Sequence, residues 1–528
     1  MDAIRIQNLR SLVDTGYVPI RPLTFLVGSN NSGKSSFLRA LLLLRQSIES
    51  RTAGPLLWFG SYVDFGGHDE ARTRFKTGDD ITFSFKMRLS QSPARRLLRR
   101  RLRLPILEDL NAVISMCVGR GARTEASRRR LYEVQFADQH IAIHFDENEN
   151  VSKLCANKLE ISANQLSLAT TRERGLFGGF YEMREQVLDA SETSDRVAMP
   201  LSKESQTLLQ ILDHVLLPLH HHRTSEQKRA ALLSELGVGS SDAMLSCIKS
   251  AKAGDAAWKR NVSEWTVGSR DFVRLRDTVL AYAAPGLIER LDSDLRDTLS
   301  KCGYIGPARA IVERYYREQS LSVAEVDFRG SNLPMVLRNL RWDETEQFEK
   351  WLMTNLGFSV SVAPTGSHLS IRMREKGGER QYNLADTGFG FSQILPVLTQ
   401  VWLAGVAHAG NEDWIGETIF LAIEQPELHL HPRLQGVVAQ VLAQTVAAAR
   451  ASGLDLRLVI ETHSEAMLNA LGHMIMEQRT SKDDVGVVYF ERETPDNETR
   501  VRLAEFNAEG FLNDWPYGFF DPLLGRNS

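Results

Sequence analysis

Residues 28–35, Gly-Ser-Asn-Asn-Ser-Gly-Lys-Ser, fit the phosphate-loop pattern G-x-x-x-x-G-K-[ST]. The glycines let backbone N–H groups converge on phosphate oxygens. Lys34 supplies a mobile cation, and the Ser35 hydroxyl can ligate Mg²⁺ at a helix N-terminus. With average residue frequencies, a chain of this length would match the pattern by chance in roughly 2% of cases. The loop therefore predicts binding of a phosphorylated ligand together with Mg²⁺.

A carboxylate that could complete this metal site follows the very apolar residues 418–423. A phosphate loop needs such a group at the end of a neighbouring strand. Glu424 is the first charge after the apolar run, and burying an unpaired carboxylate there would be unfavourable unless it faced a cation. We therefore predict that Glu424 is a metal ligand with Ser35. The alternative is a strand-end glutamate at the surface.

Two further motifs could contact the same ligand. His463 follows an apolar strand at 456–460 within Glu-Thr-His-Ser, and could sense a terminal phosphate; a structural histidine is the alternative. Residues 386–393, Asp-Thr-Gly-Phe-Gly-Phe-Ser-Gln, form a glycine-rich turn before an expected helix. The N-terminus of that helix could bind an anion, although such a turn can also serve packing alone.

These motifs need strands and helices that bring them together. Residues 3–12 and 22–28 are typical of strands and 35–46 of a helix, so the loop is expected between a strand and a helix. Antiparallel strands are then expected at 81–87, 132–136, 140–145 and 159–166. From about 203 to 318 the spacing is helical, and Asp292 and Asp294 in this block are expected to be solvated.

The C-terminal part alternates strands with helices. Helices are expected after Ser392 and from Pro432, between strands at 358–363, 369–373, 418–423 and 456–460. This alternation predicts a mainly parallel sheet. The chain is thereby divided into four expected segments: 1–90, the first half of a nucleotide-binding head; 91–200, a β lobe with a basic insertion; 201–340, a helical insertion; and 341–528, the second half of the head.

Composition excludes several classes of protein. The 528 residues are 43% hydrophobic and 24% charged with a formal charge of −3, which excludes disordered and collagen-like chains. No run of about 18 apolar residues occurs and the first ten residues do not resemble a signal peptide, so a cytoplasmic location without membrane association is expected. The four cysteines form no C-x-x-C pair and are expected to be buried thiols.

The near-neutral total hides a basic segment. Residues 91–131 contain eleven arginines and three acidic residues, a balance of +8 that leaves −11 for the rest of the chain. Helical spacing predicts a cationic face that ends at Pro105 and contains Arg95, Arg96, Arg99, Arg100 and Arg103. This face could be solvated or contact a protein partner, could bind the phosphates of DNA or RNA, or could contact a membrane surface.

The order of the motifs resembles the ABC-type heads of RecF, SMC and OLD-like ATPases. Finer features resemble bacterial ATPases of anti-phage islands, above all the ATPase subunits of Septu systems (the PtuA family): YIGPAR at 304–309, DTGFGFSQILPVL, IEQPELHLHP at 423–432, ETHSE and the closing residues 514–521. The resemblance covers about 1–90 and 300–528. It implies an α/β fold, namely an ABC-type P-loop ATPase head with an antiparallel β lobe, split by a helical insertion.

The resemblance also implies a ligand and an assembly. ATP with Mg²⁺ would be held between two protomers of a homodimer or higher homo-oligomer. One protomer would contribute Asn30, Asn31, Ser32, Gly33, Lys34, Ser35 and Ser36, with Glu424 at the metal and His463 as the switch histidine. The other protomer would contribute Gly388, Gly390 and Ser392.

One departure from the family pattern affects hydrolysis. Many cassette ATPases have a glutamate that polarises the attacking water where this chain has Gln425. An amide can orient water but cannot accept its proton at neutral pH. Slow hydrolysis and a long-lived ATP-bound dimer are therefore expected, with Gln425, Glu424 and His463 as the catalytic candidates and Glu427 as a fallback base.

The function implied by the resemblance is that of an ATPase subunit in an anti-phage complex. Only 65 residues follow His463, too few for the nuclease module of OLD-type proteins. The effector is therefore expected to be a separately encoded nuclease, an HNH protein of the PtuB kind. The alternatives are an SMC/RecF-like ATPase that acts in DNA repair or at DNA ends, and the ATPase of a transporter.

Overall fold

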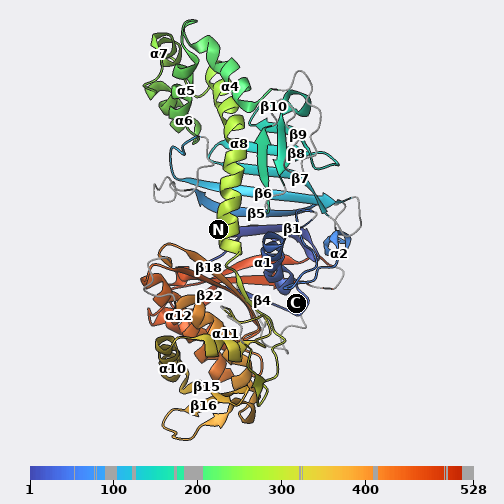
Figure 1. Cartoon of the computed structure of the whole chain (residues 1–528), viewed down its shortest axis with the longest axis vertical. Coiled ribbons are helices and arrows are strands. Elements are labelled where there is room, and N and C mark those ends of the chain that lie inside the picture. The colour runs from blue at the N-terminus through green and yellow to red at the C-terminus, as the bar shows by residue number, and fades with distance from the viewer. Residues whose placement is uncertain are drawn as a thin grey trace. The chain divides into compact units, whose positions relative to one another are not determined.

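The computed structural model describes most of the chain as two compact units. The lobe unit comprises residues 1–9 and 43–297, and the head unit comprises residues 10–42 and 298–528 (Figure 1). Within these ranges the described residues are 1–50, 52, 54–75, 78, 80–89, 104–121, 127–171, 175–182, 206–319, 323, 325–407, 414–492, 494 and 497–513.

A seven-stranded sheet forms the centre of the head unit. Its order is β13 (Gly303–Ile305), β18 (Thr418–Glu424), β19 (Asp455–Glu461), β4 (Leu23–Gly28), β20 (Val485–Glu491), β21 (Arg500–Phe506) and β22 (Leu512–Asn513). The first five strands are parallel, and the last two pairings are antiparallel. β4 is buried along its whole length and β18 is buried after its first residue, as expected for strands covered on both faces.

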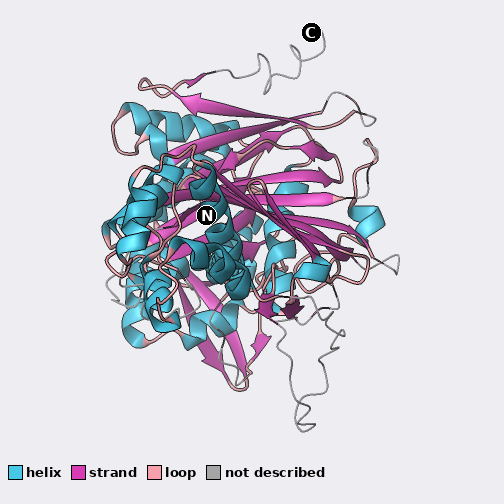
Figure 2. Cartoon of the chain, turned by 90° about the horizontal axis from the view of Figure 1, so that it is seen from above, coloured by secondary structure: helices cyan, strands magenta, loops and turns pink. Residues whose placement is uncertain are grey.

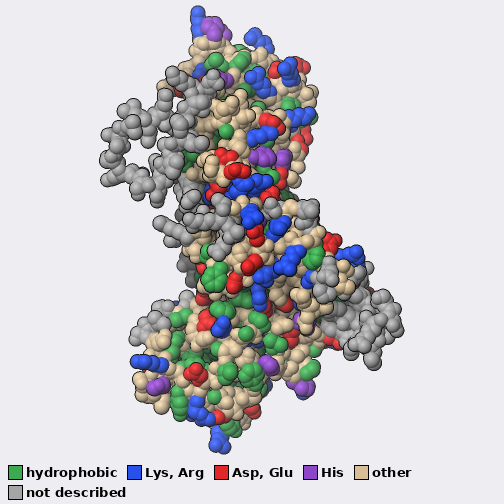
Figure 3. All heavy atoms as spheres, turned by 90° about the vertical axis from the view of Figure 1, so that its right-hand side faces the viewer, with side chains coloured by type: hydrophobic (Ala, Val, Ile, Leu, Met, Phe, Trp, Pro, Cys, Tyr) green, Lys and Arg blue, Asp and Glu red, His purple; other side chains and the backbone are tan. Residues whose placement is uncertain are grey.

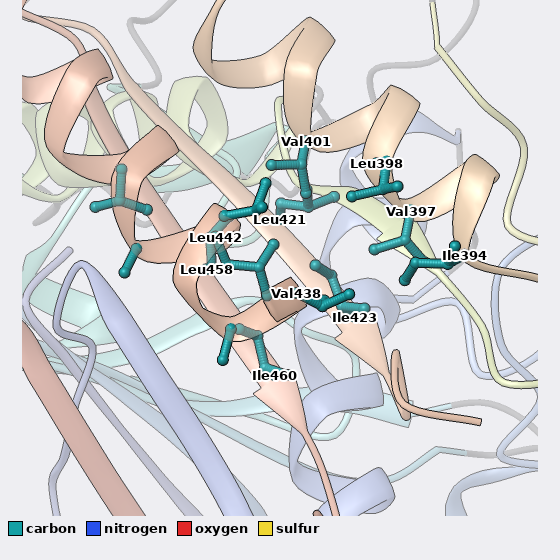
Figure 4. Close-up of a cluster of buried hydrophobic side chains, with 14 of the residues drawn as sticks. Ile394, Val397, Leu398, Val401, Leu421, Ile423, Val438, Leu442, Leu458 and Ile460 are labelled. Carbon is teal, nitrogen blue, oxygen red and sulfur yellow. The ribbon is translucent and has the colours of Figure 1, made fainter. Parts of the chain in front are cut away.

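Helices pack on this sheet through a continuous apolar core. They are α11 (Phe389–Gly405), α12 (Pro432–Ala451) and α13 (Glu465–Met476). Helix α1 (Lys34–Glu49) follows β4, and its Phe37 ring contacts Phe490 of β20. Figure 4 shows side chains of α11, including Val397 and Val401, beside Leu421 of β18 and Leu442 of α12. α12 starts with Pro432 at a position where its missing N–H is not needed, and the Ser464 hydroxyl caps α13 by accepting from Met467 N.

A second, smaller sheet belongs to the head unit. β14 (Tyr316–Arg317), β16 (His368–Glu375) and β15 (Phe358–Thr365) pair in that order, and β17 (Tyr382–Asn383) also pairs with β16. Helices α9 (Leu333–Asn339) and α10 (Trp342–Leu356) contact β15. This subdomain directly precedes α11, so it leads the chain into the glycine-rich turn.

The lobe unit contains a long antiparallel sheet and a group of helices. The sheet runs in the order β10 (Leu159–Ser162), β9 (Val151–Ala156), β8 (Gln139–Phe145), β7 (Ser127–Phe136), β6 (Leu110–Arg120), β5 (Ile81–Leu89) and β1 (Ala3–Leu9). The helices are α4 (Leu208–Leu216), α5 (Glu226–Glu235), α6 (Ser241–Ser250), α7 (Ala256–Ser263) and the 30-residue α8 (Arg270–Leu299). The shorter helices gather near the start of α8, where Arg276 donates to the Ser241 hydroxyl (Figure 1).

Short elements complete the described chain. β2 (Leu12–Asp14) and β3 (Val18–Pro19) precede the loop, whereas α2 (His68–Ala71), β11 (Leu168–Thr171) and β12 (Gly179–Glu182) belong to the lobe unit. Figure 2 distinguishes the helices, in cyan, from the strands, in magenta. On the face drawn in Figure 3, the described acidic and basic side chains are interspersed. No helix among the described residues is long and apolar enough to cross a membrane.

The predicted α/β fold is confirmed, with a parallel sheet built from both ends of the chain and a separate antiparallel lobe. The predicted strand 159–166 was too long, because a 3₁₀ turn at Ala163–Gln165 follows β10. The helical block was also too long, because α8 ends at Leu299 and strand β13 follows. The four-segment division stays a proposal, although contacts group residues 43–90 with the lobe unit.

Other expectations had mixed outcomes. Asp292 is buried rather than solvated, since its carboxylate accepts the backbone N–H groups of Leu176 and Phe177. Asp294 is largely buried beside Arg290. All four cysteines are free, and two of them are only partly buried. The predicted cationic face, Arg95, Arg96, Arg99, Arg100 and Arg103, lies outside the described residues, as do residues 514–521.

Candidate functional site

The predicted phosphate loop connects β4 to α1, as its mechanism requires. Gly28, Asn31 and Gly33 all have positive φ angles, of 148°, 63° and 96°. A Cβ atom on Gly28 would lie 2.2 Å from the Phe490 carbonyl oxygen, and one on Gly33 would lie 2.8 Å from the Ser11 hydroxyl. Glycine is therefore required at both positions by backbone conformation and by close packing.

Lys34, the first residue of α1, is held against the loop. Its Nζ donates to the carbonyl oxygens of Gly28 at 3.1 Å and Ser29 at 2.7 Å, and the residue is 3% exposed. Burial lowers the pKa of Lys34, and the nearby carboxylates of Glu461 and Glu427 oppose this shift. The loop thus contains a buried ammonium group within electrostatic range of two carboxylates.

Glu424 ends β18 with both of its oxygens occupied. Oε1 accepts from Arg39 Nε at 2.7 Å and from the Tyr304 hydroxyl at 2.8 Å, and Oε2 accepts from Arg39 Nη2 at 2.8 Å. The hydrogen bond to Glu424 is the main cause of the raised pKa of Arg39, whereas burial is the main cause of the raised pKa of Tyr304. Glu424, predicted from the sequence to bind a metal ion, is thus paired with a guanidinium one helical turn after Ser35.

Glu461, which the sequence-based site did not include, contacts the loop directly. It ends β19, and its Oε1 accepts from the Ser35 hydroxyl at 2.9 Å. β19 lies between β18 and β4, with Glu461 in register with Glu424 on one side and Leu26 on the other. Burial and the neighbouring Glu424 raise the pKa of Glu461. The signal in the sequence was weaker than for Glu424, because Glu461 follows only three apolar residues, 458–460, and Arg457 lies earlier in the same strand.

Glu427 and His463 meet beside the same loop. Glu427 Oε1 accepts from the backbone N–H of His463 at 2.7 Å, and burial raises the pKa of Glu427. Burial and the charge of Lys34 lower the pKa of His463, which favours the neutral form of its ring. Gln425 has a positive φ of 46°, and its N–H donates to the Glu461 carbonyl at 2.8 Å. The structure thus brings together the strand ends that the sequence predicted separately.

The glycine-rich turn forms the start of α11. Gly388 precedes the helix in open space, and a Cβ atom on Gly390 would lie 2.8 Å from the His429 carbonyl oxygen. The neighbouring Phe389 is 48% exposed and contacts the His429 ring edge-on. Ser392 is buried, and its hydroxyl donates to the Phe389 carbonyl at 2.6 Å. Gly388 and Phe389 therefore reach the surface of the head unit, whereas the Ser392 side chain does not.

Comparison with known proteins identifies one family. The family described as "AAA ATPase domain" matches residues 1–169 and 332–468, which together exceed half of the chain. No curated protein matches.

Solved structures of SMC heads are similar over nearly the whole chain. They include an SMC head bound to the C-terminal winged-helix domain of ScpA (11% identity; 96% of this chain and 97% of that chain covered) and a Pyrococcus furiosus SMC head with an extended coiled coil bound to the C-terminal domain of ScpA (11%; 96% and 96%). The SMC head domain from Thermotoga maritima matches with 8% identity over 95% of this chain and 98% of that chain. Each has a TM-score of 0.34, too low to carry a functional argument.

Proposed function

Because the chain belongs to the AAA ATPase domain family, we propose that residues 28–36 bind ATP with Mg²⁺ and that the protein hydrolyses the bound ATP slowly. The observation that carries this proposal is the loop between β4 and α1, with buried Lys34 and two strand-end glutamates beside it. Backbone N–H groups at the N-terminus of α1 suit phosphate oxygens. Asn30, Asn31, Ser32, Gly33, Lys34, Ser35 and Ser36 are the proposed ligands of the nucleotide.

The oxygen atoms beside the loop fit a magnesium ion. Mg²⁺ binds oxygen ligands, and Ser35 and Glu461 supply a hydroxyl and a carboxylate. Glu424, the metal ligand predicted from the sequence, ends the adjacent strand with both oxygens already hydrogen-bonded. A buried carboxylate oxygen without a hydrogen-bond donor, Glu461 Oε2, is the kind of atom that a cation would satisfy. When bound, Mg²⁺ would neutralise charge that develops on the phosphates.

Slow hydrolysis is proposed because the residue after Glu424 is a glutamine. The Gln425 amide could orient a water molecule but could not accept its proton. Glu427, two residues after Gln425, is the alternative base, and burial raises its pKa. The half-buried His463 beside it is proposed to sense the terminal phosphate.

The proposed assembly is a homodimer or higher homo-oligomer formed around ATP. The exposed Gly388 and Phe389 at the start of α11 support contact with a second copy, and the partly buried Gly390 follows them. Ser392 suits this role less well, because its buried hydroxyl is already bonded within the helix.

In the cell, we propose that the protein is the ATPase subunit of an anti-phage complex that controls a separately encoded HNH nuclease. The support is the resemblance of YIGPAR, DTGFGFSQILPVL, IEQPELHLHP and ETHSE to Septu ATPases. An SMC/RecF-like role at DNA ends is the second candidate. A small HNH gene next to the gene for this protein would favour the first role. Neighbouring DNA-repair genes without an HNH gene would favour the second.

The proposed activity and assembly can be measured on the purified protein. Mg²⁺-ATP should bind, turnover should be far below tens per second, and native mass measurement should show a dimer with ATP. A protein that stays monomeric at every ATP concentration contradicts the proposed assembly. Co-expression with neighbouring genes would identify an effector by its mass.

The basic segment provides a separate test of the DNA-binding alternative. Reversing the charges of Arg95, Arg96, Arg99, Arg100 and Arg103 should weaken DNA or RNA binding, and the wild-type affinity should fall steeply with salt. Unchanged affinity in the variant would instead favour a solvated face or a protein partner.

A further inference from the structure

Two glutamates end adjacent strands at the phosphate loop, and their carboxylates have different partners. Glu424 and Glu461 are direct neighbours in the parallel register of β18 and β19. Both are almost fully buried, at 2% and 4% exposure. Because their position and burial are alike, the hydrogen-bond partners of each carboxylate should show which one maintains the fold and which one can bind a ligand.

The Glu424 carboxylate is already neutralised by the protein. Arg39 makes a two-pronged contact with both oxygens, at 2.7 and 2.8 Å, and Tyr304 adds a third hydrogen bond. Such a planar pair is strong and geometrically specific. Transferring Glu424 to a metal ion would leave the Arg39 guanidinium and the buried Tyr304 hydroxyl without this partner.

The Glu461 carboxylate lacks such a partner. Its Oε1 accepts only the neutral Ser35 hydroxyl, and no described group donates to its buried Oε2. Lys34, a neighbouring cation, donates instead to the Gly28 and Ser29 carbonyl oxygens. A buried anion that keeps a free oxygen is unfavourable, so Glu461 is suited to receive a cation.

Strand order explains why Glu461 is at the loop. β19, and not β18, pairs with β4, the strand that leads into the phosphate loop. Glu461 is thus one strand closer to Ser35 than Glu424 is. The hydroxyl that the motif assigns to Mg²⁺ already contacts Glu461.

We propose that Glu461, and not Glu424, is the carboxylate that binds the Mg²⁺ ion accompanying ATP, and that Arg39 and Tyr304 retain Glu424 as a structural anion. This inference rests on the proposed ATP binding and identifies the metal ligand of that site. Glu424 would then act by positioning Arg39 on α1, one turn after Ser35.

Metal binding can be measured without hydrolysis. The full-length protein is saturated with a non-hydrolysable ATP analogue, and Mn²⁺ affinity is measured from the loss of the free Mn²⁺ paramagnetic resonance signal. Glu461→Gln should weaken Mn²⁺ binding by at least about tenfold, since even residues that only support metal ligands change affinity by 10–100-fold. Glu424→Gln should weaken Mn²⁺ binding by less than Glu461→Gln does, because its carboxylate stays paired with Arg39 and Tyr304 in the wild type.

Metal-free nucleotide binding provides a second readout. In EDTA, Glu461→Gln should bind a fluorescent ATP analogue as tightly as wild type or more tightly, because a negative charge near the phosphates is removed. A purely structural role for Glu461 would predict weaker binding. If the glutamine variant does not fold, Glu461→Asp and Glu461→Ala are compared instead. Glu461→Asp keeps the negative charge, so it should retain more Mn²⁺ affinity than Glu461→Ala.

The outcomes separate this inference from the proposed function. Exposed Glu465, at the start of α13, provides the matched control Glu465→Gln, which should behave as wild type. A larger or equal loss of Mn²⁺ affinity in Glu424→Gln than in Glu461→Gln would overturn the inference while leaving ATP binding intact. Failure of the wild-type protein to bind the analogue with or without metal would overturn the proposed function instead.

Discussion

The head unit and the lobe unit both bury carboxylates, but they satisfy them differently. In the lobe unit, Asp292 accepts two backbone N–H groups at 2.8 and 3.1 Å, from Leu176 and Phe177. In the head unit, Glu461 and Glu427 each keep one buried oxygen without a donor among the described residues. Both hydrogen bonds of Asp292 end on Oδ1 and come from the protein backbone, as suits a group that maintains the fold. A buried oxygen without a donor, such as Glu461 Oε2, is an atom that a bound water molecule or ion could satisfy. This contrast indicates that the head unit contains the ligand-binding site.

The two sheets explain the contrast. Parallel strands end at the same edge, so β4, β18 and β19 bring distant parts of the chain to one place. Neighbouring strands of the antiparallel lobe end at opposite edges, which disperses their terminal residues. A site assembled from several strand ends is therefore expected in the head unit.

The largest expected effect concerns Lys34. Lys34→Met should lower Mg²⁺-ATP affinity by about 100-fold and abolish hydrolysis, because it removes charge-assisted hydrogen bonds to phosphate, each typically contributing about 1.5–3 kcal/mol. Titration with a fluorescent ATP analogue measures the loss. The exposed Lys482→Met is the matched control in the same unit. If the variant binds Mg²⁺-ATP within threefold of the wild-type affinity, the loop does not bind the phosphates as proposed.

The next test concerns the lobe unit. The contribution of Asp292 to stability should depend on pH and not on ATP. Burial raises the pKa of Asp292 from 3.8 to about 6. Its folded pKa exceeds its unfolded pKa, so its contribution to stability is fully present below about pH 4 and is lost as the pH rises through 6. The difference corresponds to on the order of 3 kcal/mol.

Asp292→Asn keeps one acceptor oxygen and removes the titration. Its free energy of unfolding, relative to wild type, should therefore rise between about pH 4 and 7. Urea unfolding across this range measures the change, with substitution of the exposed Asp271 on the same helix, Asp271→Asn, as the control. A stability difference that does not vary with pH would show that Asp292 does not titrate as described.

Glu427 tests whether the head contains a base despite Gln425. If Glu427 accepts the proton from water, Glu427→Gln should lower kcat by about 100-fold with little change in ATP affinity. In wild type, kcat should rise with pH as Glu427 loses its proton, at a pH above the usual range because burial raises its pKa.

The companion variant Gln425→Glu distinguishes the two positions. It should raise kcat if Gln425 faces the attacking water, because a carboxylate can accept the proton that an amide cannot. Steady-state phosphate release measures both variants. If Glu427→Gln hydrolyses ATP as fast as wild type, Glu427 is not the base.

A smaller effect is expected for Arg39, which is about one-third exposed. Arg39→Met removes two hydrogen bonds from the buried Glu424 and should destabilise the protein by about 2 kcal/mol, measured by urea unfolding. A double-mutant cycle with Glu424→Gln should show coupling between the two residues. Additive effects would mean that the pair contributes little, and would weaken the contrast between Glu424 and Glu461.

Much of the fold and of the loop was predictable because the signals are local. The glycines and Lys34 occur in one octapeptide, and the apolar runs before Glu424 and His463 predicted buried strands that the structure contains. Asp292 was misread because helical spacing does not reveal that residues 176–177 pack against α8 and donate to its carboxylate.

The sequence by itself determined the chemistry available to this protein: a phosphate loop, carboxylates that end apolar strands, and a glutamine where a base is usual. Only the tertiary structure decided which carboxylate contacts the loop. Strand order is set by packing between distant segments, so β19 lies beside β4 and places Glu461 against Ser35. The same packing brings Arg39 and Tyr304, 265 residues apart in the chain, to Glu424.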